Sequence, residues 1–196
     1  VFSHAFPYQI DEKENQVFNL VESFRDEIDI TKNFNKGKFL SKGFLIDGII
    51  FQAEYMSLYE GKHHFLKDIL EVEVDNKYTL NREQLTKIKY LKGSKRIERV
   101  KPTGEIYYYS EGKMSLCDNV DLAGRTMLTS EGSINRSSHI IKQANNKYRF
   151  ITPLEAERLN GFDDNWTQNI ASERIRYFCM GNALVVGIIT KLADSI

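Results

Sequence analysis

The sequence has few cysteines, no excess of charge of either sign and no long hydrophobic run. Its 196 residues include two cysteines, Cys117 and Cys179, which lie far apart and outside any Cys-x-x-Cys pair. A disulfide framework and a zinc finger are therefore not favoured, and a reduced, intracellular protein is the simplest interpretation. There is no apolar stretch of about 18 residues and no secretory signal pattern, so we expect no membrane partner.

The charges balance overall but not locally. Lysine plus arginine and aspartate plus glutamate each number 27, so attraction to a polyanion has to come from patches. Residues 87–101 hold seven basic side chains against one acidic, and residues 11–29 hold seven acidic against two basic. A run of like charges is most often only solvated surface, but this asymmetry is also typical of a protein with one face for nucleic acid.

Short elements separated by glycines are expected in the first half of the chain. Residues 1–16 read as the end of a strand and a polar link, and apolar residues at helical spacing predict a short helix over 17–24. Alternating apolar residues on either side of Asp47-Gly48 predict a β-hairpin with that pair as its turn. Asn81 and Gly93 are residue types that cap helices, which predicts a helix between them.

The second half is expected to mix strands and loops before a helical end. Residues 104–112 read as a tyrosine-rich strand, with the tyrosines in a strand core more often than on a surface that stacks bases. Residues 124–151 alternate Thr, Ser, Gly and Arg with apolar residues, which predicts strands joined by exposed loops. Residues 152–196 predict helices, with an irregular break at 180–182.

The stretch "RFITPLEAERLNGFDDNW", residues 149–166, carries the densest local signal. A capping box opens its helix, with Thr152 and Glu155 each able to bond the other's backbone amide around a proline at the first helical position. Gly161 is the residue type that ends a helix in the left-handed conformation. Local chemistry explains the helix, but it explains neither the arginine before it nor the Asp-Asp pair and tryptophan after it.

Three stretches, in this order, resemble the DNA (cytosine-5) methyltransferases. "GRTMLTS" looks like the element at the end of the family's target recognition domain. "RFITPLEAERLNGFDDNW" is similar to the ninth conserved motif, R-x-L-T-P-x-E-x-x-R-L-Q-G-F-P-D-x-W, from which it departs at Ile151, Asn160 and Asp163. "GNALVV" is similar to the tenth motif. The resemblance covers residues 91–196 well, and residues 1–90 only through their position.

The motifs that carry the family's chemistry do not occur in the sequence. It contains no Pro-Cys-Gln, no Glu-Asn-Val and no Phe-x-Gly-x-Gly. Neither cysteine has the neighbours of the family's nucleophile, so both are expected to be incidental thiols and no residue of this chain is predicted to be catalytic. Since the chain also begins at Val1 and not at a methionine, we expect the C-terminal part of such an enzyme, either cut from a longer chain or one polypeptide of a split enzyme.

The resemblance implies an α+β fold. A target recognition domain of mixed strands and loops would be followed by C-terminal helices that belong to a Rossmann-like methyltransferase catalytic domain. In this division residues 1–35 link from the catalytic domain, residues 36–148 form the target recognition domain, and residues 149–196 pack on the catalytic domain with motifs nine and ten.

The resemblance also implies a reaction and its partners. The family transfers a methyl group from S-adenosyl-L-methionine to carbon 5 of a cytosine rotated out of a specific duplex site, and restriction-modification is the expected setting. This chain alone is expected to be inactive, cytoplasmic in a bacterium and bound to double-stranded DNA and to the catalytic part of the enzyme. Asn182 and Ala183, at the start of a helix with free amides, are expected to form one wall of the S-adenosyl-L-methionine pocket, which residues outside this chain complete.

Two polar stretches are the candidates for DNA contact. Thr126 matches the family threonine that contacts the target-strand backbone, and its loop offers hydroxyl groups and arginines to phosphates and base edges. In the basic run, Arg99 and Lys101 have the chemistry to read guanine, and Glu131 in the loop has that to accept from cytosine N4. The predicted DNA-binding residues are Lys95, Arg96, Arg99, Lys101, Arg125, Thr126, Thr129, Ser130, Glu131 and Arg136.

Three other functions are compatible with parts of the sequence: a DNA-binding module, a metal site and a nuclease site. A stand-alone, sequence-specific DNA-binding module without catalysis stays open. His63 and His64 are adjacent and point to opposite faces of an extended segment, which disfavours a metal pair. The acidic residues near position 70 lack the following lysine of a nuclease site, and no metal site is predicted.

Overall fold

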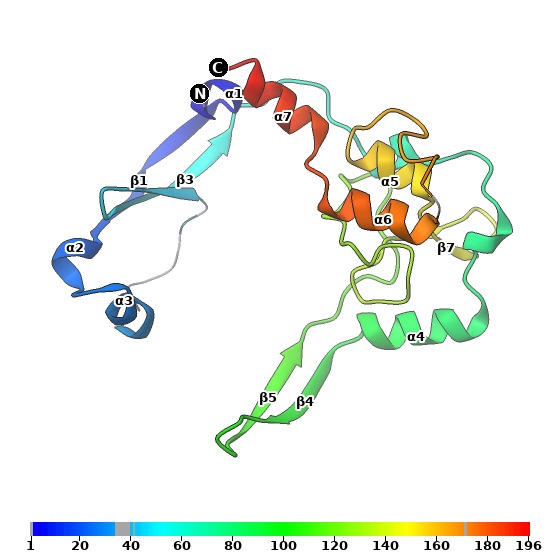
Figure 1. Ribbon diagram of the computed structural model, residues 1–196, viewed down its shortest axis with the longest axis horizontal. Coiled ribbons are helices and arrows are strands. Elements are labelled where there is room, and N and C mark those ends of the chain that lie inside the picture. Colours follow the sequence, from blue (N-terminus) through cyan, green and yellow to red (C-terminus); the bar gives the residue numbers. More distant parts are fainter. Residues whose placement is uncertain (1, 34–39, 41, 171) are drawn as a thin grey trace. The chain divides into compact units, whose positions relative to one another are not determined.

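The computed structural model describes residues 2–33, 40, 42–170 and 172–196. The chain divides into two compact units, which we describe separately (Figure 1). The first unit comprises residues 1–61 and 191–196, and the second unit comprises residues 62–190. These limits differ in position from the predicted divisions at 35 and 148, which stay predictions about the complete enzyme.

The first unit is built on a three-stranded antiparallel sheet in the order β1-β3-β2. The Asp47-Gly48 turn forms as predicted, with positive φ angles of 48° and 78° at its two residues. The predicted polar link is wrong, because β1 continues through it and pairs with β3 as far as Asn19. The helix predicted over 17–24 is confirmed in its second half, where α2 forms, and is wrong over 17–19, which belong to β1. The glycine at position 37 lies outside the described residues. The elements are α1 (Phe2–Ala5), β1 (Tyr8–Asn19), α2 (Leu20–Ser23), α3 (Glu27–Asn33), β2 (Lys42–Ile46) and β3 (Ile49–Ser57).

The second unit combines short helices with two separate two-stranded antiparallel ribbons, β4-β5 and β6-β7. Of the strands predicted over 124–151, two short ones form at its end, and residues 121–139 are loop. The elements are η1 (Leu66–Ile69), η2 (Asn76–Tyr78), α4 (Arg82–Lys92), β4 (Lys95–Val100), β5 (Ile106–Glu111), β6 (Ile140–Lys142), β7 (Tyr148–Phe150), α5 (Pro153–Leu159), α6 (Glu173–Asn182) and α7 (Val186–Ala193).

The caps predicted for α4 and α5 are confirmed. Asn81 and Gln84 form a capping box at the start of α4, each side chain accepting from the other's backbone amide at 2.9 Å, and Gly93 is the C-cap. Thr152 and Glu155 form the corresponding box on α5. Gly161 follows α5 with a φ of +79°, which a residue with a side chain rarely adopts. Both helices therefore begin and end where local chemistry dictates.

Two hydrophobic cores lie on the two sides of the β6-β7 ribbon. Successive strand residues point to opposite faces, so Ile140 enters one core while Ile141 enters the other. Ile140 packs with Ile88 of α4 and Phe150, and Ile141 packs with residues of α5 and α6. This small ribbon therefore fixes α4 on one side and α5 and α6 on the other.

The C-terminal helices break later than predicted. α6 ends at Asn182 and α7 begins at Val186, three residues beyond the expected position, because Asn160 at the end of α5 holds both sides of the break. Its side-chain amide donates to the Met180 carbonyl at 2.6 Å, and its carbonyl accepts from the Val186 amide at 2.9 Å. By length and composition, Glu173–Ala193 could cross a membrane, but the helix is broken in the middle and anchored there to α5.

Candidate nucleic-acid interface

A buried ion pair explains the arginine that precedes α5. The Arg149 guanidinium donates from Nη1 and Nη2 to the two carboxylate oxygens of Glu155, each at 2.7 Å, and neither side chain is more than 3% exposed. Glu155 also accepts from the amides of Thr152 and Glu71 at 2.8 Å. The Thr152 hydroxyl donates to the Glu71 carboxylate. Arg149 therefore completes the capping box from β7 and ties strand, helix and the segment after η1 together.

The residues after α5 make further ion pairs with the helix. Arg158 donates to both carboxylate oxygens of Asp164, at 2.7 and 2.6 Å, and these hydrogen bonds lower the pKa of Asp164. Glu157 is fully buried and accepts from Arg176 of α6 at 2.7 Å and from Thr167. Trp166 remains 64% exposed at the surface. The Asp-Asp-x-Trp stretch is thus anchored to α5 through one aspartate, and its tryptophan is left outward.

The loop that carries Thr126 is fixed at its start by Arg125. This guanidinium pairs with Asp118 and also donates to the carbonyls of Ser137 and Ser138 at 3.1 and 3.3 Å. Burial raises the pKa of Asp118, but hydrogen bonds from Arg125 and from the Ile140 amide outweigh it and leave the pKa lowered. Arg125 is therefore internally committed, and Thr126 beside it is exposed.

The same loop is fixed at its centre by a buried Glu131–His139 pair. The Glu131 carboxylate accepts from the His139 amide at 2.8 Å and lies 2.9 Å from His139 Nδ1. Glu131 is 4% exposed and His139 is fully buried. Both carboxylate oxygens therefore have partners inside the loop, and the assignment of Glu131 to cytosine N4 stays a prediction that requires the buried carboxylate to become accessible.

Asn135 organises the remaining turns of the loop. Its side-chain oxygen accepts from the amides of Ser137 and Ser138 at 2.7 and 3.0 Å. Its side-chain nitrogen donates to the carbonyl and the hydroxyl of Ser130 at 3.1 and 2.8 Å. This network joins Ser130 to Ser137 and Ser138 and leaves Ser130 at the surface of the loop.

Two glycines let α6 lie directly against the loop. A Cβ atom on Gly181 would lie 2.4 Å from the Thr129 amide nitrogen. A Cβ atom on Gly132, whose φ is +70°, would lie 2.3 Å from the Tyr177 ring. Tyr177 is buried, which raises the pKa of its hydroxyl, and that hydroxyl donates to the Ile151 carbonyl at 2.6 Å. The glycine of the tenth-motif resemblance thus has a packing role against the backbone that carries Thr129.

The β4-β5 ribbon is exposed and carries arginines stacked on tyrosines. The Arg96 guanidinium lies 4.3 Å from the centre of the Tyr108 ring, and the Arg99 guanidinium lies 4.4 Å from that of Tyr109. Tyr108 lies opposite Glu98 and Tyr109 lies opposite Ile97, and successive residues of a strand point to opposite faces. The two arginine–tyrosine contacts therefore lie on opposite faces of the ribbon. The prediction of core tyrosines is wrong: the three tyrosines are 37–52% exposed, because both faces of this two-stranded ribbon are largely uncovered.

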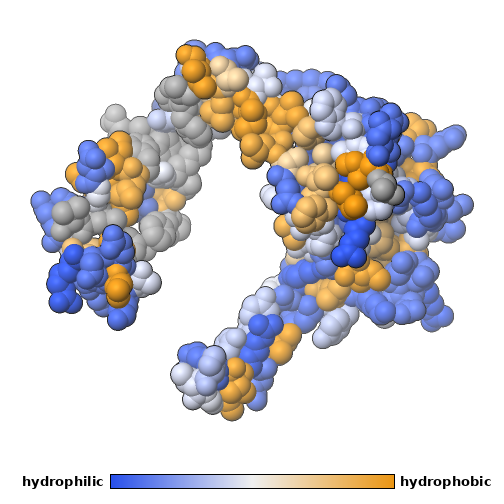
Figure 2. All heavy atoms as spheres, viewed as in Figure 1, coloured by the Kyte–Doolittle hydropathy of each residue, from blue (hydrophilic) through white to orange (hydrophobic). Residues whose placement is uncertain are grey.

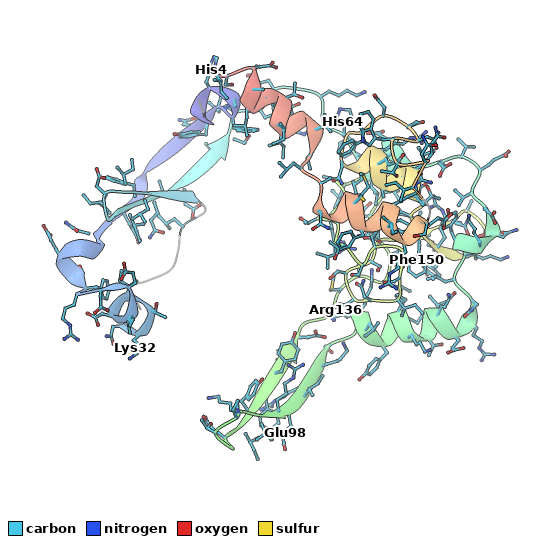
Figure 3. The ribbon with its side chains drawn as sticks, in the orientation of Figure 1. His4, Lys32, His64, Glu98, Arg136 and Phe150 are labelled. Carbon is cyan, nitrogen blue, oxygen red and sulfur yellow. The ribbon has the colours of Figure 1, made fainter. Side chains whose placement is uncertain are left out.

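Two of the predicted DNA-binding residues hold the base of this ribbon instead. Lys95 donates to Glu111 at 2.7 Å and to the Leu91 carbonyl at 3.0 Å. Arg136 donates to the carbonyls of Leu91 and Gly93 at 2.6 and 3.1 Å and also to that of Gly112, where α4 meets the ribbon (Figure 3). Both side chains thus have a structural role at the base of the ribbon, and their contact with DNA stays a prediction. Lys101 near the ribbon tip is exposed and pairs with Glu105 at 2.7 Å.

The predicted cofactor residues lie at the end of a helix and not at its start. Asn182 is the last residue of α6 and donates to the Phe178 carbonyl at 2.9 Å, and Ala183 is the C-cap. The free amides expected beside Asn182 are therefore not there, because the next helix begins three residues after Ala183. Asn182 itself is exposed, and its assignment to the cofactor stays a prediction.

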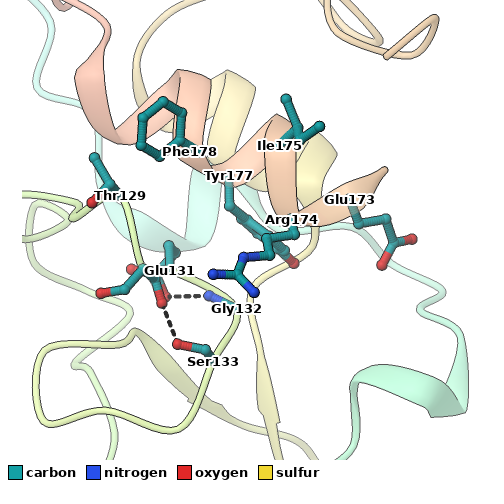
Figure 4. A pocket seen from close by; sticks show the side chains of 10 residues that line it. Thr129, Glu131, Gly132, Ser133, Glu173, Arg174, Ile175, Tyr177 and Phe178 are labelled. Carbon is teal, nitrogen blue, oxygen red and sulfur yellow. Dashed lines mark hydrogen bonds between the residues drawn. The ribbon is translucent and has the colours of Figure 1, made fainter. Parts of the chain in front are cut away.

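Sequence reasoning missed a cleft between the loop and α6. The cleft has a volume of about 780 Å³ and is lined by residues 129–133 and by Glu173, Arg174, Ile175, Tyr177 and Phe178 (Figure 4). The residues next to Arg174 in the sequence form no motif that predicts this cleft, because the opposite wall of the cleft is a loop more than 40 residues earlier in the chain. Among the described residues, no group of histidine, cysteine, aspartate and glutamate is placed to hold a metal ion, and both cysteines are free.

Comparisons with known proteins agree with the motifs. A sequence profile of the C-5 cytosine-specific DNA methylases matches residues 9–196. The type II methyltransferase M.Sau3AI of Staphylococcus aureus is 45% identical over 196 residues, which are all of this chain and 46% of that protein. The chain therefore spans about half the length of this relative.

Solved structures of two methyltransferases are similar to this chain. The S. pombe Dnmt2 methyltransferase matches with a TM-score of 0.51 and 15% identity, over 75% of this chain and 49% of that chain. The Entamoeba histolytica methyltransferase EhMeth matches with a TM-score of 0.46 and 16% identity, over 95% of this chain and 52% of that chain. At this identity the Dnmt2 likeness concerns the fold alone.

Proposed function

Because this chain belongs to the C-5 cytosine-specific DNA methylase family, we propose that it is the DNA-recognition and C-terminal part of a DNA (cytosine-5) methyltransferase. The relative named as a type II methyltransferase supports a restriction-modification setting in a bacterial cytoplasm. The enzyme transfers a methyl group from S-adenosyl-L-methionine to cytosine carbon 5. The Pro-Cys-Gln and Phe-x-Gly-x-Gly motifs belong to the part of the enzyme that this chain does not span, so this chain alone is inactive.

The observation that carries this proposal is an exposed apolar strip after α6. Leu184, Val185, Ile188 and Ile189 are 69%, 38%, 46% and 42% exposed. Apolar side chains gather along α6 and α7 in the space-filling view (Figure 2). A contiguous apolar surface of this kind needs a partner. We assign this strip to the catalytic part of the same enzyme, since the relative is about twice the length of this chain.

The exposed apolar strip is adjacent in the sequence to the residues that we assign to the cofactor. Asn182 and Ala183 directly precede Leu184, so a catalytic part docked on the strip also meets these two residues. The exposed amide side chain of Asn182 has the hydrogen-bonding groups to contact a carboxylate or an amine of S-adenosyl-L-methionine. This chain supplies one wall of that pocket, and the docked part supplies the rest.

The DNA-contacting surface is the loop of Thr126 together with the β4-β5 ribbon. Thr126, Thr129 and Ser130 present hydroxyl groups from a fixed loop, and Arg96 and Arg99 present guanidinium groups that lie over tyrosine rings. A guanidinium in contact with a ring through its π face can still donate from its N–H groups, which suits contact with guanine or phosphate. Lys101 adds a charge near the ribbon tip.

A complementation experiment tests the proposed function. This chain is combined with the portion of M.Sau3AI that it does not match, and transfer of labelled methyl groups to duplex DNA is measured. We expect transfer from the mixture and none from either part alone. Methyl transfer by this chain alone contradicts the assignment, and duplex binding without transfer in any combination favours the DNA-binding module without catalysis.

Matched variants test the docking strip in the same assay. Ile188→Glu places a charge on the strip and is expected to abolish assembly and transfer. Val72→Glu makes the same kind of change at a fully exposed position of the second unit and is expected to leave both unchanged. Equal transfer by the two variants would sink the docking assignment.

A further inference from the structure

We infer that the cleft between residues 129–133 and α6 binds a phosphate of the DNA backbone, and that Arg174 is the residue that holds it. This inference rests on the proposed role of the second unit in DNA recognition. The contact comes from α6, which lies outside both the basic run and the Thr126 loop.

Arg174 differs from the other arginines that line the packed parts of the second unit. Arg125, Arg136, Arg149, Arg158 and Arg176 each hold a carboxylate, and the first four also hold at least one backbone carbonyl. Within the described part of the chain, no ion pair or hydrogen bond involves the Arg174 guanidinium. It is exposed, and Figure 4 shows it reaching from α6 toward the loop at Gly132.

The opposite wall of the cleft offers hydroxyl donors on a rigid backbone. Thr129 is exposed, and Gly181 holds the backbone at this residue tightly against α6. The Ser130 hydroxyl accepts from Asn135 at 2.8 Å, so its own hydrogen stays available for an acceptor in the cleft. A guanidinium and two hydroxyl groups that line one cleft are a donor set for the oxygens of a phosphate and its neighbours.

The two carboxylates that line the cleft are already engaged. Glu131 is buried and accepts from His139, as described above. Glu173 accepts from Lys77 Nζ at 2.6 Å and from the Tyr78 hydroxyl at 2.7 Å, so a cation is seated on it. Arg174 is therefore the unbalanced charge of the cleft, and the ligand that it selects is an anion.

The size and position of the cleft fit a stretch of nucleic-acid backbone. A volume of about 780 Å³ exceeds that of one phosphate and admits the adjoining sugars. The cleft is continuous with Thr129 and Ser130, which follow Thr126 in the same loop. A DNA strand bound at Thr126 can therefore continue into this cleft and contact Arg174.

The test compares two arginines in the complete enzyme assembled from this chain and its catalytic part. Arg174→Ala is measured against Arg82→Ala, which removes the same charge at an exposed position on α4 outside the cleft. The probe is a short fluorescein-labelled duplex of random sequence, whose binding is followed by anisotropy over a series of salt concentrations. A thermal scan of both variants checks that the fold is retained.

We expect Arg174→Ala to bind duplex roughly three- to tenfold more weakly and to lower the slope of log K against log salt by about 0.9, the value for one phosphate. Arg174→Lys keeps the charge and is expected to retain most of the slope. Equal affinity and slope for Arg174→Ala and Arg82→Ala overturn the inference, and so does a loss of assembly with the catalytic part at unchanged DNA affinity. Those two outcomes overturn the inference about Arg174 alone. If the unsubstituted enzyme binds no duplex, the proposed function fails, and this inference fails with it.

Discussion

The guanidinium of Arg149 and the carboxylate of Glu155 face each other along two parallel hydrogen bonds of 2.7 Å in a site closed to solvent. Glu155 is also the third residue of the α5 capping box, so one carboxylate serves both the start of a helix and the anchoring of β7. Removal of either partner leaves an uncompensated charge in the interior.

Arg149→Met is therefore expected to lower the free energy of unfolding by about 3–5 kcal/mol, the cost of breaking a buried pair from one side. Urea unfolding of the second unit within the intact chain measures it. Lys87→Met, which breaks the exposed Lys87–Glu83 pair on α4, is the control and is expected to change stability little. A cost below about 1 kcal/mol for Arg149→Met contradicts the role of the pair.

Gly181→Ala is expected to destabilise the second unit by about 1–3 kcal/mol, because the new methyl group meets the backbone of Leu128 and Thr129. Gly187 lies in α7 with no atom within 4 Å of an added Cβ, so Gly187→Ala is expected to stabilise the helix by about 0.5–1 kcal/mol. Thermal unfolding of both variants checks the contrast, and changes of the same sign would refute the packing argument.

Arg136→Ala is expected to act on stability and Arg99→Ala on DNA affinity. Arg136 supplies three backbone carbonyls with donors at the base of the ribbon, and leaving them without donors costs about 1–3 kcal/mol. Arg99 contacts one exposed ring, and its loss leaves the fold unchanged but weakens duplex binding. Urea unfolding and anisotropy, applied to both variants, separate the roles; the reverse pattern means that the assignments are exchanged.

Acid sensitivity is expected to depend in part on Asp118. Its pKa is lowered in the folded protein, so its contribution to stability is full above the unfolded value of about 3.9 and is lost as the pH falls through the lower folded value. Asp118→Asn is therefore expected to be less stable at neutral pH and to lose less stability between about pH 5 and pH 3 than the unsubstituted chain. Urea unfolding at several pH values measures both, with Asp121→Asn as the exposed control. Parallel pH profiles for the two variants would remove Asp118 from the explanation.

Elements that depend on near neighbours could be predicted from the sequence. The Asp47-Gly48 turn and the capped helices α4 and α5 form where expected. Each is decided by φ preferences or by a side chain that bonds an amide three residues away, and both are properties of a short peptide. The helix predicted over 17–24 forms only from residue 20, because residues 17–19 pair with β3, a strand distant in the sequence.

The candidate site could be predicted only as a region. The sequence places basic and hydroxyl residues in the ribbon and the loop, but it does not show which of them are already occupied. Lys95, Arg136 and Glu131 have the same residue types as DNA-contacting groups, yet their partners are carbonyls and side chains 4 to 45 residues away. Arg174 lies in no sequence motif that would predict a binding role for it.

Residue order is enough to identify the family through three ordered motifs, to predict the capped helices and to show that the catalytic motifs do not occur in this sequence. Which charged groups are free to bind, and which have partners within the fold, becomes visible only once the chain is folded. The physical reason is that a guanidinium or a carboxylate has the same chemistry wherever it stands in the chain. Its availability depends on burial and on partners that folding brings together, as it does for Arg149, enclosed with Glu155, and for Arg174, open to the cleft.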